Sequence, residues 1–400
     1  MEHNHTITKK FNSLRDHRHY RLVLLVLSGL CLILAVWLGA ERVAAPSFVR
    51  ADDFVAYWAA WRINLSGGNP YDPEQLLLLQ RAIDATEVEA VMIWSPPWML
   101  VMAMPFGWLD YPLSRTLWLL LSIIIVFVCA NQLWLLYGGS RDTRWIGWIV
   151  GFTFAPVFDG LQKGQTSVLL LLGMVGFLNF IQRRNGWLAG ICLALLAVKP
   201  HTLYLFTLAA LFWSFSRRQW SVLAGSALTL LAATAIAWVI NPGVIGQYLE
   251  AVSNYPPSGL ATPTLGGISR FLFGPQRFWI QFVPPAIGLV WLIYYWLQRR
   301  KVWDWLAQAP LLILVSNVTT AYGWTWDQIP GLVAVIQIAN LLIPLRREFK
   351  TGAVFAAYLV IDCLALFIRG NQLWKFWFAP ALLVDYLVSM KLLRTRKSKR

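Results

Sequence analysis

Apolar segments of membrane-spanning length recur along most of the chain, and short polar turns separate them. A hydrocarbon core about 30 Å thick needs about 20 residues of apolar helix to cross it. One apolar segment, residues 94–109, contains three prolines, which interrupt helices, and is set aside. The remaining segments predict twelve spans, at 22–40, 112–137, 145–161, 165–182, 187–199, 200–216, 220–240, 278–297, 305–321, 328–345, 352–369 and 373–391.

The distribution of charge decides how residues 94–109 are placed. If this segment does not cross, the loops fall into two sets, one with a net charge of about +18 and the other with about −1. Short cytoplasmic loops of membrane proteins are enriched in Lys and Arg, so the basic set is predicted to lie inside. A full crossing at 94–109 would place most of the basic pairs outside. We therefore expect an interfacial or re-entrant segment there.

These assignments predict an all-α polytopic membrane protein with a single transmembrane domain over residues 22–391. Basic cytoplasmic tails, 1–21 and 392–400, flank that domain, and a long first extracytoplasmic loop covers residues 41–111. The first span is expected to stay uncleaved because Pro46 spoils the nearest signal-peptidase site. Both termini are then cytoplasmic, and the protein lies in the cell membrane.

Composition agrees with a membrane protein and excludes an ordinary soluble enzyme. Hydrophobic residues make up 58% of the 400 residues and charged residues 13%, against about 25% charged in soluble domains. The net charge of +15 is explained by cytoplasmic loops, so no nucleic-acid partner is expected.

Two adjacent carboxylates open the polar loop that follows the first span. Asp52 and Asp53 precede a helical pattern in which Phe54, Tyr57 and Trp61 share one face, which suits a membrane interface. Asp52 can cap this helix, and Asp53 lies in its first turn. A carboxylate held just above the bilayer can also serve as a general base. Both interpretations stay open.

A lysine stands between two apolar runs on the predicted outer side. Lys199 is followed by Pro200, which interrupts the helix, and His201 lies next to it. A lysine in such a place usually has a partner, although it can also extend to the membrane surface. Together with backbone donors of the following helix, Lys199 and His201 predict an anion site. Gln165 opens another span on this side and either adds donors or only begins its helix.

The last outer turn contains Trp326 and Asp327. Asp327 can cap the span that begins near residue 329, and tryptophans suit the membrane interface. The same residue types also bind sugars, so composition does not separate the two. No Gly-rich phosphate loop, dinucleotide fingerprint or metal-ligand spacing is present in the sequence, and we expect no cofactor and no metal.

Six short motifs, in their order along the chain, resemble glycosyltransferase family 87, a family of polytopic C-type transferases. They are Asp53-Phe54-x-x-Tyr57, Gly67-Gly68-Asn69-Pro70-Tyr71, Ser95-Pro96-Pro97, Lys163-Gly164-Gln165, Lys199-Pro200 and Trp326-Asp327-Gln328.

The resemblance implies transfer of a hexose, with mannose as the family-based choice, from a polyprenyl-phosphate donor to a lipid or glycan hydroxyl. It places the essential Asp at Asp53, with Asp52 as the neighbouring competitor. The donor phosphate is expected at Lys199, with Gln165 and His201. Tyr57, Tyr71, Trp326 and Asp327 are expected to bind substrate.

This mechanism is a single inverting displacement, in which Asp53 takes the acceptor proton and Lys199 stabilises the departing phosphate. An ion pair between Asp53 and Lys199 without a catalytic role is the structural alternative. A transporter or lipid flippase is the competing class, but such proteins commonly have repeated halves, and no convincing repeat is present here.

Overall fold

The computed structural model describes residues 52–345, 349–368 and 372–397, and only helices occur among them. The α-helices are α3 (Asp52–Leu65), α4 (Pro73–Ile83), α5 (Pro97–Ala103), α6 (Tyr111–Leu136), α7 (Arg144–Thr153), α8 (Ala155–Lys163), α9 (Ser167–Gln182), α10 (Gly186–Ala194), α11 (Tyr204–Ser216), α12 (Trp220–Ile240), α13 (Val244–Asn254), α14 (Leu265–Phe273), α15 (Val283–Arg299), α16 (Trp305–Thr319), α17 (Leu332–Leu342), α18 (Phe349–Phe367) and α19 (Phe378–Lys397). Among the short 3-10 helices are η1 (Met104–Trp108), η3 (Leu195–Val198), η5 (Phe278–Phe282), η7 (Thr325–Gly331) and η9 (Gln372–Lys375).

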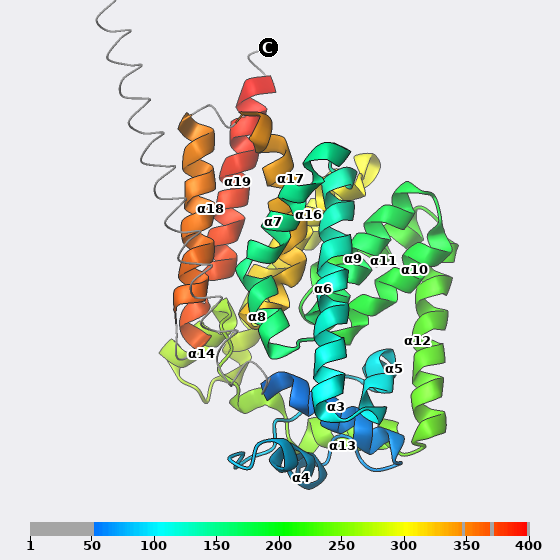
Figure 1. The fold of residues 1–400 in the computed structure, drawn as a ribbon. Coiled ribbons are helices and arrows are strands. Elements are labelled where there is room, and N and C mark those ends of the chain that lie inside the picture. Colours follow the sequence, from blue (N-terminus) through cyan, green and yellow to red (C-terminus); the bar gives the residue numbers. More distant parts are fainter. Residues whose placement is uncertain (1–51, 346–348, 369–371, 398–400) are drawn as a thin grey trace, which may run out of the picture.

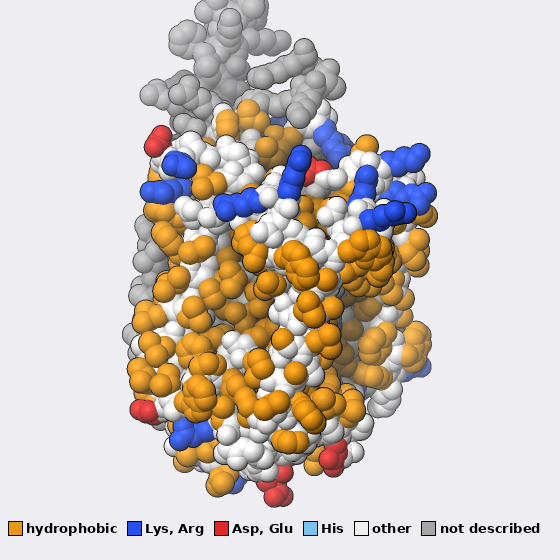
Figure 2. Space-filling view, turned by 90° about the vertical axis from the view of Figure 1, so that its right-hand side faces the viewer, with side chains coloured by type: hydrophobic (Ala, Val, Ile, Leu, Met, Phe, Trp, Pro, Cys, Tyr) orange, Lys and Arg blue, Asp and Glu red, His pale blue; other side chains and the backbone are white. Residues whose placement is uncertain are grey.

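The long helices stand side by side, and a cap of shorter helices covers one end of the bundle (Figure 1). Helices α3, α4, α5 and α13 gather at the end opposite the C-terminus. Lys and Arg side chains gather near the C-terminal end, acidic side chains appear at the capped end, and apolar side chains cover the surface between them (Figure 2).

Helices long and apolar enough to cross a membrane occur six times in the described residues. They cover Tyr111–Leu136, Trp220–Ile240, Phe278–Val302, Thr325–Leu345, Phe349–Phe367 and Gln372–Thr395. Four shorter apolar helices correspond to the predicted spans at 165–182, 187–199, 200–216 and 305–321. The protein therefore has the character of a multi-pass membrane protein. Twelve crossings remain a prediction, and the span at 22–40 lies outside the described residues.

The predicted span at 145–161 is not a single helix, because α7 and α8 share it. Helix α7 ends at Thr153, and α8 begins at Ala155 with Pro156 in its first turn. Proline has no N–H, and its ring clashes with the carbonyl four residues earlier, so a single helix is interrupted here. Phe154, between α7 and α8, is extended. Hydropathy did not reveal the break because apolar residues stand on both sides of it. In residues 94–109, only the short helices α5 and η1 form.

The aromatic face of α3 packs inside the protein, which corrects the expectation that it lies at the membrane interface. Phe54 and Trp61 are fully buried, and Tyr57 is nearly so. The rings of Phe54 and Trp61 lie 6.2 and 5.7 Å from the ring of Trp118 on α6. Periodicity identified the face correctly, but α6 covers it.

Helix α8 is held by polar side chains from three other elements. The Asp362 carboxylate on α18 accepts the backbone N–H of Ala155 at 2.8 Å, at the first residue of α8. In the middle of the helix, Asp159 pairs with Lys375 of η9 at 3.3 Å, and both side chains are buried. At its other end, the Arg115 guanidinium donates to the carbonyls of Leu161 and Gln162 at 3.0 and 2.7 Å.

A glycine ends α8 and lets the chain turn directly into α9. Gly164 has a φ of +65°, and its carbonyl accepts the indole N–H of Trp118 at 2.9 Å. The next residue, Gln165, donates its backbone N–H to the carbonyl of Gly160. This arrangement is a Schellman ending. A Cβ at Gly164 would lie 2.7 Å from the Cβ of Phe54, so α3 and this turn touch.

Replacing Gly164 with alanine should destabilise the protein more than the same change at Gly138. Both glycines have a positive φ, but nothing lies within 4 Å of a Cβ at Gly138. Gly138→Ala should lower the free energy of unfolding by about 1–2 kcal/mol through backbone strain. Gly164→Ala adds the clash with Phe54. Thermal unfolding of the purified protein in detergent measures both, and equal losses would contradict the close packing of α3.

Candidate active site

The ammonium of Lys199 is the buried charge at the centre of the site. Lys199 follows η3 directly and is only 9% exposed. Its Nζ donates to Asp327 Oδ1 at 2.6 Å, Gln165 Oε1 at 2.8 Å and Ser167 Oγ at 3.2 Å. An ammonium has three N–H donors, so these three acceptors use all of them. Burial of such a charge is tolerable only because it is paired and hydrogen-bonded.

The carboxylate of Asp327 carries out two tasks at once. Its Oδ1 accepts from Lys199 and from the Ser167 hydroxyl, the latter at 2.7 Å. Its Oδ2 accepts the backbone N–H of Trp324 at 3.0 Å, where η7 begins. Asp327 therefore caps η7, which begins at Thr325 and not near residue 329 as the sequence suggested, and is also the ion-pair partner of Lys199.

One amide connects the ammonium with the first-loop carboxylate. The Gln165 side chain receives hydrogen bonds at Oε1 from Lys199 and, at 3.1 Å, from the Tyr57 hydroxyl. Its Nε2 donates to Asp53 Oδ2 at 2.5 Å. Burial raises the pKa of the Tyr57 hydroxyl above its ordinary value, so this group stays protonated and donates. Among the described residues, Lys199 forms its salt bridge with Asp327 and not with Asp53.

A cavity of about 480 Å³ opens beside these groups. It brings together seven of the residues predicted from the sequence. They are Asp53, Tyr57, Gln165, Lys199, His201, Trp326 and Asp327.

One further predicted residue, Tyr71, does not line this cavity. Tyr71 is buried behind the wall, where its hydroxyl donates to the carbonyl of Ser95 at 2.9 Å and its ring packs against Tyr248. Helix α3 begins at Asp52, whose side chain lies outside the described set. The predicted roles of all these residues remain proposals.

Aromatic rings that were not predicted as site residues complete the cavity wall. Trp94, Tyr248 and Trp324 line it. The rings of Trp324 and Trp326 are nearly parallel, with centroids 5.8 Å apart, and the Lys163 ammonium lies 5.3 Å from the centre of the Trp326 ring. Flat aromatic surfaces beside a carboxylate suit a sugar ring. The sequence signal for Trp324 was its place two residues before Trp326.

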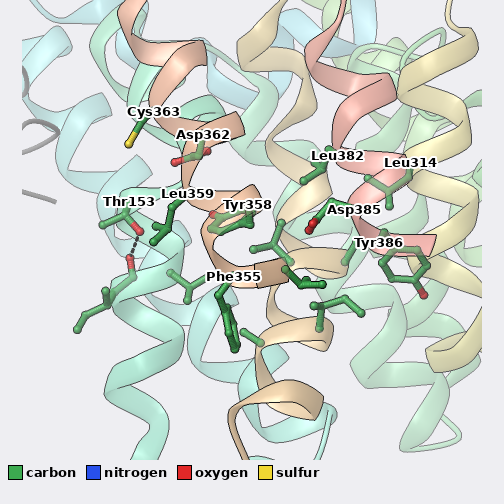
Figure 3. Close-up of a pocket in the computed structure, with 17 residues that line it drawn as sticks. Thr153, Leu314, Phe355, Tyr358, Leu359, Asp362, Cys363, Leu382, Asp385 and Tyr386 are labelled. Atoms are coloured by element: carbon green, nitrogen blue, oxygen red, sulfur yellow. Dashed lines mark hydrogen bonds between the residues drawn. The ribbon is translucent and has the colours of Figure 1, made fainter. Parts of the chain in front are cut away.

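A second cavity, of about 300 Å³, lies among α7, α16, α17, α18 and α19. Its walls are mainly apolar, and its carboxylates are Asp362 on α18 and Asp385 on α19 (Figure 3). Asp362 already accepts the N–H at the start of α8. None of the site residues predicted from the sequence lines this second cavity. Asp362 is connected to the candidate site through its hydrogen bond to the first residue of α8.

The fold and the site define an all-helical membrane protein with an ion pair and a second carboxylate beside a polar-lined cavity. Residues 95–317 match the model of glycosyltransferase family 87, which is more than half of the chain. The chain therefore belongs to glycosyltransferase family 87, as the sequence motifs predicted. Searches of curated proteins and of solved structures found no match. Lys199 and Gln165 lie inside the matched region, whereas Asp53 and Asp327 lie outside it.

Removing one member of the Lys199–Asp327 pair should destabilise the protein strongly. Lys199→Met leaves the Asp327 carboxylate, which is 2% exposed, without its cation. Breaking a buried pair in this way costs about 3–5 kcal/mol. The double variant Lys199→Met/Asp327→Asn should recover part of that loss, because the neutral amide oxygen still accepts from Trp324. Thermal unfolding of the wild type, the two single variants and the double variant measures the coupling between the two residues. Lys301→Met, at an exposed lysine, is the control. Additive losses would contradict the coupling.

Proposed function

We propose that the protein transfers a hexose, with mannose as the first candidate, from a polyprenyl-phosphate donor to a hydroxyl of a lipid or glycan acceptor. The observation that carries this proposal is the connection of a carboxylate, Asp53, to an ammonium, Lys199, through the single amide of Gln165 beside one cavity. Membership in the family supplies the class of reaction. The pair supplies a base and a cation, the two charges that this reaction requires.

The proposed step is one displacement at the anomeric carbon of the donor sugar. The acceptor oxygen forms a bond to this carbon while its proton passes to Asp53. The bond between the anomeric carbon and the phosphate oxygen breaks, and its electron pair leaves with the polyprenyl phosphate. A single displacement inverts the anomeric configuration and needs only one base, in contrast with the paired carboxylates of retaining hydrolases.

The donor phosphate is proposed to bind at Lys199 and His201. Because all three Lys199 donors are occupied, a phosphate oxygen has to displace one acceptor. Ser167 is the candidate, since its contact is the longest of the three and its hydroxyl has a second partner in Asp327. His201 is exposed and lines the cavity, where it can add a donor.

Two features favour a lipid-borne donor used on the extracytoplasmic face. The leaving group of such a donor is already a phosphate in the membrane, so no nucleotide pocket is required. The cavity also lies among the elements of the capped end, away from the end where basic side chains gather (Figures 1 and 2). By the positive-inside rule, the basic end is cytoplasmic.

The direct test incubates the purified protein with polyprenyl-phosphate-mannose, with and without candidate acceptors. Transfer releases free polyprenyl phosphate, which thin-layer or liquid chromatography separates from the donor. A flippase moves the donor intact across a vesicle membrane and releases none. Release of polyprenyl phosphate together with a glycosylated acceptor supports the proposal, and movement without release overturns it.

Asp53→Asn should abolish sugar transfer, because an amide cannot accept the acceptor proton. The loss expected for removal of a general base is about 10²- to 10⁴-fold in kcat. Asp72→Asn is the matched control, since Asp72 caps α4 by accepting the N–H groups of Glu74 and Gln75, and asparagine caps equally well. Asp52→Asn belongs in the same assay. Loss in Asp52→Asn alone would assign the base to Asp52, and full activity in both variants would remove the carboxylate from the mechanism.

Ser167→Ala should lower the apparent KM for the donor lipid, because it frees one N–H of Lys199 for the phosphate. A gain of one net hydrogen bond, about 1 kcal/mol, corresponds to a decrease of about fivefold in this KM. Lys199→Met, made together with Asp327→Asn to preserve folding, should raise the same KM and leave the KM of the acceptor nearly constant. An unchanged donor KM in this double variant would exclude Lys199 from phosphate binding.

A further inference from the structure

The orientation of the Gln165 amide is dictated by the charges on its two sides. An ammonium can only donate hydrogen bonds, and a carboxylate can only accept them. Lys199 therefore requires the carbonyl oxygen of Gln165, and Asp53 requires the NH₂ group. The opposite orientation would lose both bonds. The amide is polarised in one fixed sense between the two groups.

The backbone that carries Gln165 is fixed as firmly as its side chain. Gln165 is 3% exposed and follows the positive-φ residue Gly164 in the ending of α8. Trp118 holds the carbonyl of Gly164, and Arg115 holds the last carbonyls of the helix. Tyr57, one turn after Asp53 on α3, adds the second donor to Oε1. A side chain held at both ends on a rigid turn is suited to orient a neighbour.

We propose that Gln165 is a positioning residue, which holds the Asp53 carboxylate through Nε2 in the orientation that accepts the acceptor proton. This inference rests on the proposed function and deepens it. It differs from the sequence-based expectation that Gln165 binds the donor phosphate, because its NH₂ group points to Asp53 and its carbonyl oxygen would repel a phosphate oxygen.

The two roles predict different kinetics. A phosphate ligand acts on donor affinity, whereas a residue that orients the base acts on the chemical step. The hydrogen bond from Nε2 also favours the ionised form of Asp53, so its loss raises the pH at which Asp53 becomes protonated. Among the described residues, three titratable groups also face Gln165: the neutral Tyr57 hydroxyl, Lys199, which favours the ionised form of Asp53, and Asp327, which opposes it.

The test compares Gln165→Leu and Gln165→Glu with the wild type in the donor-release assay over a range of pH. Gln165→Leu removes both hydrogen-bonding ends of the amide. We expect kcat to fall by about 100-fold, the cost of a misplaced catalytic group. The donor KM should not rise, because the Lys199 N–H that Gln165 releases becomes available to the phosphate. The acid limb of the kcat profile should move about one unit to higher pH.

Gln165→Glu is the second variant and covers a failure of Gln165→Leu to fold. Its carboxylate keeps an oxygen towards Lys199 but adds a negative charge beside Asp53, so the acid limb should move further to higher pH than in Gln165→Leu. The matched control is Gln162→Leu, the same substitution one turn earlier at a side chain that does not line the cavity. It should keep the wild-type pH profile.

The outcomes separate this inference from the function on which it rests. A raised donor KM with an unchanged kcat and pH profile would overturn the positioning role and return Gln165 to phosphate binding. Variants that behave like Gln162→Leu would overturn it as well, with the transferase function intact. A wild-type protein that releases no polyprenyl phosphate from any donor would overturn the function and the positioning role together.

Discussion

The burial of a single ammonium is the constraint on which the site depends. Removing such a charge from water costs several kcal/mol unless its partners compensate. Lys199 finds its three acceptors on the turn after α8, on the first residue of α9 and on η7. Asp327 is 128 residues away in the sequence. The need to satisfy one charged group therefore joins segments that are distant in the sequence, beside the cavity that Lys199, Gln165 and Asp327 line.

The position of the turn that carries Gln165 depends on α8, the helix before it, which has only nine residues. A helix of this length is not stable alone in water. Polar side chains hold it at both ends and in the middle, and two of them, Asp362 and Lys375, come from the C-terminal part of the chain. Residues that never touch the cavity thus determine where its central amide lies.

The sequence identified site residues where a polar side chain stood in apolar surroundings. It was less informative about which residues would pair with one another. Lys199 was conspicuous because a lysine between apolar runs needs a reason. Which carboxylate would pair with it was not predictable, since hydropathy and spacing do not distinguish Asp53 from Asp327 across such a distance. The break between α7 and α8 was visible only as Pro156 within an apolar run. The helical period of the aromatic residues identified the apolar face of α3. It did not identify the elements that bury this face.

The pairing of Lys199 with Asp327 also explains how one site can hold a base and a cation without their neutralising each other. If Asp53 were the direct partner of Lys199, the ion pair would stabilise its charged form and weaken it as a base. In the structure, Asp327 takes the ammonium, and the Gln165 amide stands between Lys199 and Asp53. The neutral amide transmits polarity and no net charge. The two carboxylates are thereby separated into different tasks: Asp327 keeps Lys199 in place, and Asp53 is positioned for the proton transfer that we propose.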